Sequence, residues 1–259
     1  MKHADLDNFH IKDVKNELHP SVFFKDEEYD LFILRLPIVD DNEKINYKSF
    51  SFIITEKSYF YYDKQKDEFF DLENMHEFYK FIDNQINNTM KLTSSLATKV
   101  SDLEELVYEA NTKNNFNTIW FSYKNDLIRI NRVLYKAIEA MEDIMYRYKN
   151  EDDYLERNFE DLREHLQRAY RNVGHNLEKL DTIFSFYQTQ VNEQSNKIVY
   201  ILTLLSGIFL PLNFIVGFFG MNTTSLPFTT ENNGTFSVIS ILVLTGLIAT
   251  LITLLMRRK

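Results

Sequence analysis

Two uncharged apolar segments near the C-terminus constrain the fold more than any other feature of this sequence. The first runs from Ile198 to Phe219 and the second from Val238 to Met256. A helix of about 20 apolar residues crosses the ~30 Å hydrocarbon layer of a bilayer, so each segment is long enough to span it. Neither segment has the N-terminal position of a signal peptide. We therefore expect a polar N-terminal part followed by two membrane-spanning helices.

The charges that flank these segments predict their orientation. Lys197 precedes the first segment and three basic residues at 257–259 follow the second, whereas the stretch 220–237 contains no Lys or Arg and one acid, Glu231. Basic flanks tend to remain on the cytoplasmic side of a membrane. We therefore expect a protein of the inner (cell) membrane with two spans, both termini in the cytoplasm and a short outer loop.

The composition excludes several classes of protein. The chain has 38 acidic and 29 basic side chains, a net charge of −9, and three of the bases lie at the extreme C-terminus. Such an acidic surface disfavours nucleic acid as a partner. It either attracts cations or serves solubility alone. The absence of cysteine fits a cytoplasmic domain and excludes a thiolate metal site.

The sequence shows no recognisable enzyme site. It contains six glycines, none of them arranged as a phosphate-binding loop, so we expect neither nucleotide binding nor ATP hydrolysis. The six histidines form no HExxH pattern and no pair at i,i+4 spacing. The acidic groups at 151–153 and at Glu156, Glu160 and Glu164 either face solvent or bind a cation.

The N-terminal part reads as a small sheet followed by helices. We expect the stretch 1–20 to be irregular, because it is rich in charge. The β-branched and aromatic runs 31–36 and 50–62 predict strands. The stretch 72–113 is expected to form two shorter helices with a break near Asn87 and Asn88.

Two stretches carry apolar residues at helical spacing. No proline lies between Ile38 and Leu210, and no glycine precedes Gly174, as long helices require. The first stripe comprises Leu127, Ile130, Leu134, Ala137, Met141, Ile144 and Tyr148. The second comprises Leu155, Phe159, Leu162, Leu166, Ala169, Val173, Leu177, Leu180, Phe184, Tyr187 and Val191. The second has a doubled step of four around Gly174, which predicts local unwinding of a supercoil.

Nothing in the pattern ends the second helix before the first apolar segment. One helix is therefore expected from about residue 153 to Phe219, roughly 100 Å long at 1.5 Å per residue. A helix of that length needs packing partners, which the 125–149 helix and further copies of the chain would supply.

The first apolar segment carries small and polar residues on one helical face. This face, here called the polar stripe, consists of Asn196, Val199, Thr203, Ser206, Leu210, Asn213, Gly217 and Gly220. An amide as deep in the span as Asn213 should face protein or water, because facing lipid is costly. The stripe therefore indicates either close helix packing through small residues or the wall of a pore. A pore requires several copies around an axis, because two spans cannot enclose one.

At residues 208–222, "IFLPLNFIVGFFGMN", the sequence resembles the CorA-type family of divalent-cation channels, whose first span ends in Gly-Met-Asn. The order of acidic α/β domain, long helix, motif, short loop and basic tail matches that family. The resemblance implies a funnel-shaped homopentamer in the lipid bilayer that carries Mg²⁺, with Co²⁺ or Ni²⁺ as surrogates. It also implies gating by intracellular Mg²⁺ bound as a regulatory ion.

The resemblance assigns roles to individual residues. Gly220, Met221 and Asn222 would form the selectivity filter. The pore-lining or gating positions would be Asn213, Leu210, Leu202, Val199 and Asn196, and the stripe adds Ser206 and Thr203. Asp161 falls where the family has an acidic residue of an inter-subunit Mg²⁺ site, and its partner would be Asp71 or Glu73.

The sequence departs from the family pattern at three places. Asn213 stands where threonine is usual, Leu210 where methionine is common, and Ser185 where an acid occurs at the cytoplasmic mouth. These departures bear on gating and conductance and leave the class unchanged.

The resulting fold class is an α+β cytoplasmic domain followed by a long stalk helix continuous with the first of two transmembrane helices. The expected divisions are an α/β domain at 1–125, a helical hairpin and stalk at 126–197, a pore helix at 198–222, an outer loop at 223–237, a second span at 238–256 and a basic tail at 257–259. The alternatives are a transporter of zinc or another divalent cation from the same superfamily, or a membrane-anchored coiled-coil scaffold.

Overall fold

The computed structural model describes residues 6–40, 44–56, 58–109, 115–151, 154–221, 226 and 234–256, with side chains described up to residue 252. The chain divides into two compact units, Met1–Phe186 and Tyr187–Lys259. The first unit holds a small antiparallel sheet and helices. The second holds the apolar end of a long helix and a separate apolar helix, so the α+β class with a long helix and a C-terminal apolar helix is confirmed.

The sheet is a five-stranded antiparallel meander in the order β1 to β5. Its strands are β1 (Val22–Lys25), β2 (Asp30–Val39), β3 (Ile45–Ile54), β4 (Tyr59–Asp63) and β5 (Glu68–Asp71). β2 and β3 pair along their whole length, with Phe32 opposite Phe52 and Leu31 opposite Ile53. The expected run 50–62 is therefore a hairpin of two strands, and β1 and β5 extend the sheet beyond the two predicted runs.

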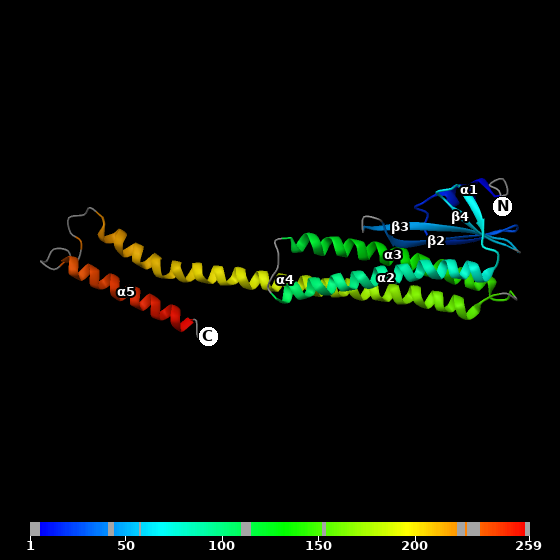
Figure 1. Cartoon of the computed structure of the whole chain (residues 1–259). Coiled ribbons are helices and arrows are strands. Elements are labelled where there is room, and N and C mark those ends of the chain that lie inside the picture. The colour runs from blue at the N-terminus through cyan, green and yellow to red at the C-terminus, as the bar shows by residue number, and fades with distance from the viewer. Residues whose placement is uncertain are drawn as a thin grey trace. The chain divides into compact units, whose positions relative to one another are not determined.

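Both faces of the sheet are buried, because helices cover each of them (Figure 1). Leu31, Ile33 and Ile53 point to one face, where they pack with Val14 of α1 (Asn8–Lys15). The opposite face carries the aromatic rings of β2 and β3. Phe52 meets Phe78 of α2 there, with ring centroids 5.1 Å apart.

We expected the N-terminal stretch to be irregular because of its charge, but the structure shows a helix there. Residues 8–15 form α1, whose N-cap Asp7 accepts a hydrogen bond from the backbone N–H of Phe9. Val14 is 1% exposed, and Ile11 is partly buried against the same core cluster. Two apolar contacts in a short charged helix leave little periodic signal, which explains the error.

Three long helices follow the sheet: α2 (Met75–Tyr108), α3 (Phe116–Tyr148) and α4 (Glu156–Phe219). The expected break near residues 87–88 is wrong, because α2 is one helix of 34 residues. Thr89 and Leu92 are buried, so the apolar face continues past the two asparagines. Helix propensity is a weak signal, and tertiary packing overrides it here.

The stripe predicted for α3 is confirmed, because all of its members are buried. The stripe of α4 forms in part: six of its predicted members are buried, without the doubled step around Gly174. The members that are only half-buried are Leu155, Leu177, Phe184 and Tyr187, and Val191 is exposed. Buried positions continue at Asn176, Leu180 and Ile183, so the spacing of three and four is unbroken. The amide of Asn176 donates to the carbonyl oxygen of Asn172 at 2.8 Å, which satisfies one polar group inside the core. A pattern restricted to apolar residues misses such a position.

Trp120 joins α3 to α4 within the first unit. Its ring stacks on Phe184 with centroids 4.4 Å apart, and its indole N–H donates to the carbonyl oxygen of Leu180 at 3.0 Å. Lys124 forms an ion pair with Asp181 one turn further along the same seam. α3 begins at Phe116, before the expected division at residue 125, and α4 begins at Glu156.

Candidate functional site

The polar stripe of α4 is uncovered in the single chain. Every one of its positions is exposed, from Asn196 to Gly220. Leu210 is 75% exposed and Val199 is 56% exposed, and Leu202 beside the stripe is 63% exposed. The hydroxyl of Thr203 donates to the backbone carbonyl oxygen of Val199 at 2.8 Å, which satisfies its polar group within the helix.

The second apolar helix, α5 (Gly234–Met256), covers a different face of α4. Ile208, Leu212 and Ile215 are half-buried, and Leu212 packs against Gly246 of α5. Both α4 and α5 are long and apolar enough to cross a membrane. α5 therefore leaves most of the stripe free to face water or another copy of the chain, and Thr203 alone among its members lines the space between α4 and α5.

The backbone geometry at the end of α4 explains why the Gly-Met-Asn motif begins with glycine. The backbone N–H of Gly220 donates to the carbonyl oxygen of Val216 at 2.9 Å, and that of Met221 donates to Phe218 at 3.4 Å. A Cβ atom at position 220 would lie 3.0 Å from the Val216 oxygen, closer than a side chain normally approaches. Met221 is 47% exposed, so its side chain is available to an ion path or a neighbour. Asn222 lies outside the described residues.

Pro211 lies inside α4, where it carries no N–H to donate. The carbonyl oxygen of Gly207, four residues earlier, is the one that loses its intrahelical partner. Both residues line a space between α4 and α5. The carbonyl oxygen of Gly207 is therefore a polar group of this apolar helix that lies outside the stripe.

The three acids expected at a regulatory Mg²⁺ site lie in the first unit. Asp161 is on α4, with its carboxylate half exposed and Oδ1 3.5 Å from Nε2 of His165. Asp71 ends β5 and accepts the backbone N–H of Glu73 at 2.8 Å. Glu73 has a φ of 59°, in the left-handed region. Carboxylate oxygens are ligands that Mg²⁺ prefers, so the donor set fits.

No three His, Cys, Asp or Glu side chains within the described ranges lie together as a metal-binding group. Asp161, Asp71 and Glu73 therefore do not form a complete site in one chain. A site built from them needs acids from a second copy, as the inter-subunit hypothesis requires.

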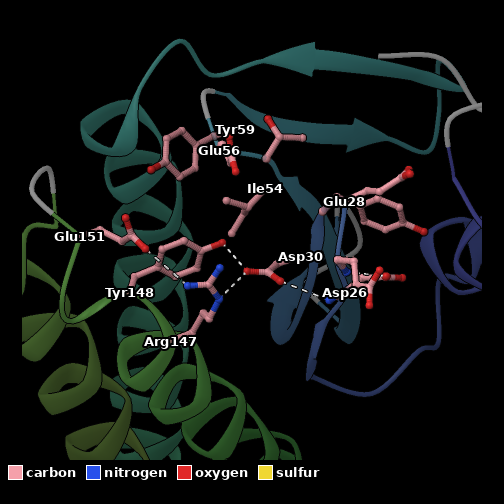
Figure 2. Close-up of a pocket in the computed structure, with 12 residues that line it drawn as sticks. Asp26, Glu28, Asp30, Ile54, Glu56, Tyr59, Arg147, Tyr148 and Glu151 are labelled. Carbon is pink, nitrogen blue, oxygen red and sulfur yellow. Dashed lines mark hydrogen bonds and ion pairs between the residues drawn. The ribbon is translucent and has the colours of Figure 1, made fainter.

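Sequence reasoning missed an acidic pocket in the first unit, which Figure 2 shows. It has a volume of about 330 Å³ and lies between the β1–β2 turn, the β3–β4 turn and the end of α3. The carboxylates that line it are Asp26, Glu27, Glu28, Asp30, Glu56 and Glu151. Four of them lie together at residues 26–30, but Glu56 and Glu151 come from distant parts of the sequence, so no local pattern predicts the pocket.

Asp30 is buried at the base of this pocket, at 3% exposure. The Tyr148 hydroxyl donates to its Oδ2 at 2.7 Å, and Arg147 Nε lies 3.1 Å from the same oxygen as an ion pair. Burial and the bond to this carboxylate raise the pKa of Tyr148 above its ordinary value. Arg147 also pairs with Glu151 at 3.4 Å. Arg147 thus pairs with two of the six carboxylates that line the pocket.

The described fold defines a class of protein with an N-terminal α+β unit and two helices that can span a membrane, the first of which continues a long helix of the α+β unit. The model of the family "CorA-like Mg2+ transporter protein" matches residues 1–258. The chain belongs to this family, as the resemblance at the Gly-Met-Asn motif predicted.

Two curated relatives are similar to part of the chain. YfjQ of Bacillus subtilis (strain 168), whose name assigns it to metal ion transport, is 26% identical over 172 residues, covering 64% of this chain and 52% of YfjQ. The cobalt/magnesium transport protein CorA of Thermotoga maritima is 22% identical over 185 residues, covering 70% of this chain and 51% of that protein. The chain thus spans about half the length of the curated relatives it matches.

Solved structures show the same fold. The CorA magnesium transporter of Methanocaldococcus jannaschii matches with a TM-score of 0.80 at 17% identity, covering 96% of this chain and 83% of the other. The full-length CmaX protein matches with a TM-score of 0.67 at 15% identity, covering 97% and 82%. The cytoplasmic domain of ZntB from Vibrio parahaemolyticus matches with a TM-score of 0.55 at 11% identity, covering 73% and 80%.

Proposed function

We propose that the chain forms a homopentameric channel that carries Mg²⁺, with Co²⁺ and Ni²⁺ as surrogates, into the cell down the membrane potential. The observation that carries this proposal is the uncovered polar stripe of α4, which leads to the Gly-Met-Asn motif. Membership of the CorA-like family supports it. A membrane-anchored scaffold would have no use for a column of amides on the face that α5 leaves bare.

Several stripes arranged around one axis would make a polar path. Mg²⁺ gives up its water reluctantly, so amide and carbonyl oxygens that accept hydrogen bonds from the hydrated ion suit it better than a tight carboxylate cage. Rings of Asn222, Asn213 and Asn196 would provide such oxygens in sequence. The lack of a side chain at Gly220 would let its backbone lie near the axis at the outer mouth. Binding of this kind is firm enough to admit the ion and weak enough to release it.

Apolar rings would supply the gate. Leu210 and Leu202 are exposed and have no polar atoms to hold water, so narrowing at these rings would empty the path. The membrane potential supplies about 2.3 kcal/mol per charge per 100 mV, hence about 4.6 kcal/mol for a divalent cation. A potential that is negative inside the cell therefore drives uptake of the cation.

Intracellular Mg²⁺ would regulate the path by bridging subunits. Asp161 of one copy and Asp71 or Glu73 of the next would share an ion, and that ion would favour the closed arrangement by binding it better than the open one. The half-exposed carboxylate of Asp161 is accessible for this role.

The decisive experiment measures ion flux in proteoliposomes. The wild-type chain should take up Mg²⁺ when a negative internal potential is imposed, and Asn222→Ala should reduce uptake at least tenfold. Leu247→Phe, at an exposed apolar position of α5, is the control and should leave uptake unchanged. Parallel measurements with Zn²⁺ and Co²⁺ separate a magnesium channel from a zinc transporter. Absence of flux for every divalent cation would support the scaffold.

Regulation is tested separately by varying the internal Mg²⁺ concentration. Asp161→Asn should keep conducting at internal Mg²⁺ levels that close the wild-type channel. Glu178→Gln removes an exposed carboxylate from the same helix and should close normally. An Asp161→Asn channel that closes at the wild-type concentration removes Asp161 from the regulatory scheme.

A further inference from the structure

The second unit contains a crevice between α4 and α5, with a volume of about 430 Å³. Its walls include Tyr200, Gly207 and Pro211 of α4, together with Thr203 at the edge of the polar stripe, and Thr245, Ala249 and Ile252 of α5. Most of this surface is apolar, and small residues from both helices leave the space open. An added Cβ at Gly207 would meet no atom within 4 Å, so the gap reaches the helix backbone.

One end of the crevice is basic. Lys197 lies one turn before Tyr200 on α4, is exposed, and forms no ion pair in the part of the chain that the structure describes. α5 runs back alongside α4, so its C-terminal end lies at the Tyr200 end of the crevice (Figure 1). Three basic residues follow α5 in the sequence. The linker at the opposite end contains no Lys or Arg.

We propose that this crevice binds one acyl chain of an anionic phospholipid, whose phosphate pairs with Lys197. The proposal rests on the membrane location given above. An apolar groove that opens between two spans is surrounded by lipid chains, and basic pockets between transmembrane helices on the cytoplasmic side bind anionic headgroups. A tyrosine at the mouth suits the level of the headgroups, because its ring is apolar and its hydroxyl is polar.

Charge favours a lipid over a second copy of the chain as the occupant. In an oligomer several Lys197 side chains approach one another and repel, and a further α4 would add another positive charge. A phosphate at this end of the crevice relieves that repulsion because it neutralises Lys197.

The test uses the full chain purified in detergent and native mass spectrometry with added phosphatidylglycerol and phosphatidylcholine of identical acyl chains. The wild-type chain should retain phosphatidylglycerol about fivefold better, the preference that one lysine near a headgroup provides. Lys197→Gln should abolish this preference, whereas Lys91→Gln, an exposed lysine of α2, should keep it. Equal retention of the two lipids by the wild-type chain would overturn the proposal.

The crevice itself is tested by filling it. Gly207→Leu should lower retention of both lipids several-fold, and Ala249→Leu should do the same from α5. Gly207→Leu places its side chain in open space and replaces glycine with a better helix former, so the helix should persist. Leu247→Phe adds volume outside the crevice and should retain lipid as the wild-type chain does.

Two results would show that the crevice does not bind lipid. One is wild-type retention of lipid in both filled variants. The other is a changed mass of the protein assembly in the filled variants with unchanged lipid per chain, which would show that a second copy occupies the space. Lipid retention is measured without ion flux, so the two proposals are tested independently. The lipid proposal can fail in a chain that transports Mg²⁺, and the transport proposal can fail in a chain that retains lipid.

Discussion

Replacing Tyr148 with phenylalanine would test the buried contact that ties the end of α3 to the start of β2. The change removes only the hydroxyl, which donates to Asp30 Oδ2 at 2.7 Å. A hydrogen bond to a buried charge contributes about 1.5–3 kcal/mol. Arg147, 3.1 Å from the same oxygen, and the Asp26 N–H, 3.3 Å from Oδ1, remain. We therefore expect a loss near the lower end, about 1.5–2 kcal/mol in the free energy of unfolding.

Urea unfolding of the full chain in detergent micelles measures this loss. Trp120 is the only tryptophan, and its stacking on Phe184 makes its fluorescence a reporter of the first unit. Tyr146→Phe is the control, because Tyr146 is 74% exposed and its ring is retained. The raised pKa of Tyr148 means that the stabilisation is present below the ordinary tyrosine pKa of about 10 and is lost as the pH rises through the folded-state value.

A double-mutant cycle identifies the cause of the loss. In an Asp30→Asn background the tyrosine no longer meets a charge, so the cost of Tyr148→Phe should fall by about 1 kcal/mol. An equal cost in both backgrounds, or a cost below about 0.5 kcal/mol in the wild-type chain, would refute the assignment of this energy to the Asp30 contact.

Three further predictions concern the pore and the core. Asn213→Leu should reduce Mg²⁺ uptake into proteoliposomes at least tenfold, because it makes the middle of the stripe apolar. Phe214→Leu lies off the stripe and should conduct normally. Equal flux in the two variants would contradict the role of the stripe. Burial lowers the pKa of Lys64 to about 8, so the charged form is disfavoured by folding. The free energy of unfolding of the wild-type chain, measured by urea titration, should therefore rise relative to that of Lys64→Met as the pH rises from about 8 to about 10.5. A difference that does not change with pH would show that burial does not lower the pKa of Lys64. Phe159 is 1% exposed, and Phe159→Ala should cost about 3–5 kcal/mol in the same unfolding assay; a loss below about 1 kcal/mol would mean that α4 does not pack there.

The long helices follow from sequence because their signal is local and repeats. The α3 stripe is buried in full, and α4 continues to Phe219 as its pattern predicts. The two exceptions involve asparagine. Asn176 occupies a core position that an apolar count omits, and Asn87 and Asn88 do not interrupt α2, because residues on either side of them are anchored in the core.

The polar stripe was likewise readable from sequence, since helical spacing places its members on one face, and the Gly-Met-Asn ending was readable through its resemblance to the CorA-type family. The reason for Gly220 was not readable. It depends on the 3.0 Å approach of a Cβ to the Val216 carbonyl, which exists only once the helix end has formed. The crevice beside Gly207 also required the structure, because its second wall comes from α5.

By itself, the sequence determined the two apolar spans, the acidic α+β part before them and the polar face of the first span. These are properties of composition and spacing along a single element. Only the tertiary structure showed that Asp30 lies beside Tyr148, which is 118 residues away, and that α5 covers the apolar face of α4 and leaves the stripe exposed. Such contacts join residues whose separation along the chain carries no periodic signal, so packing alone decides them.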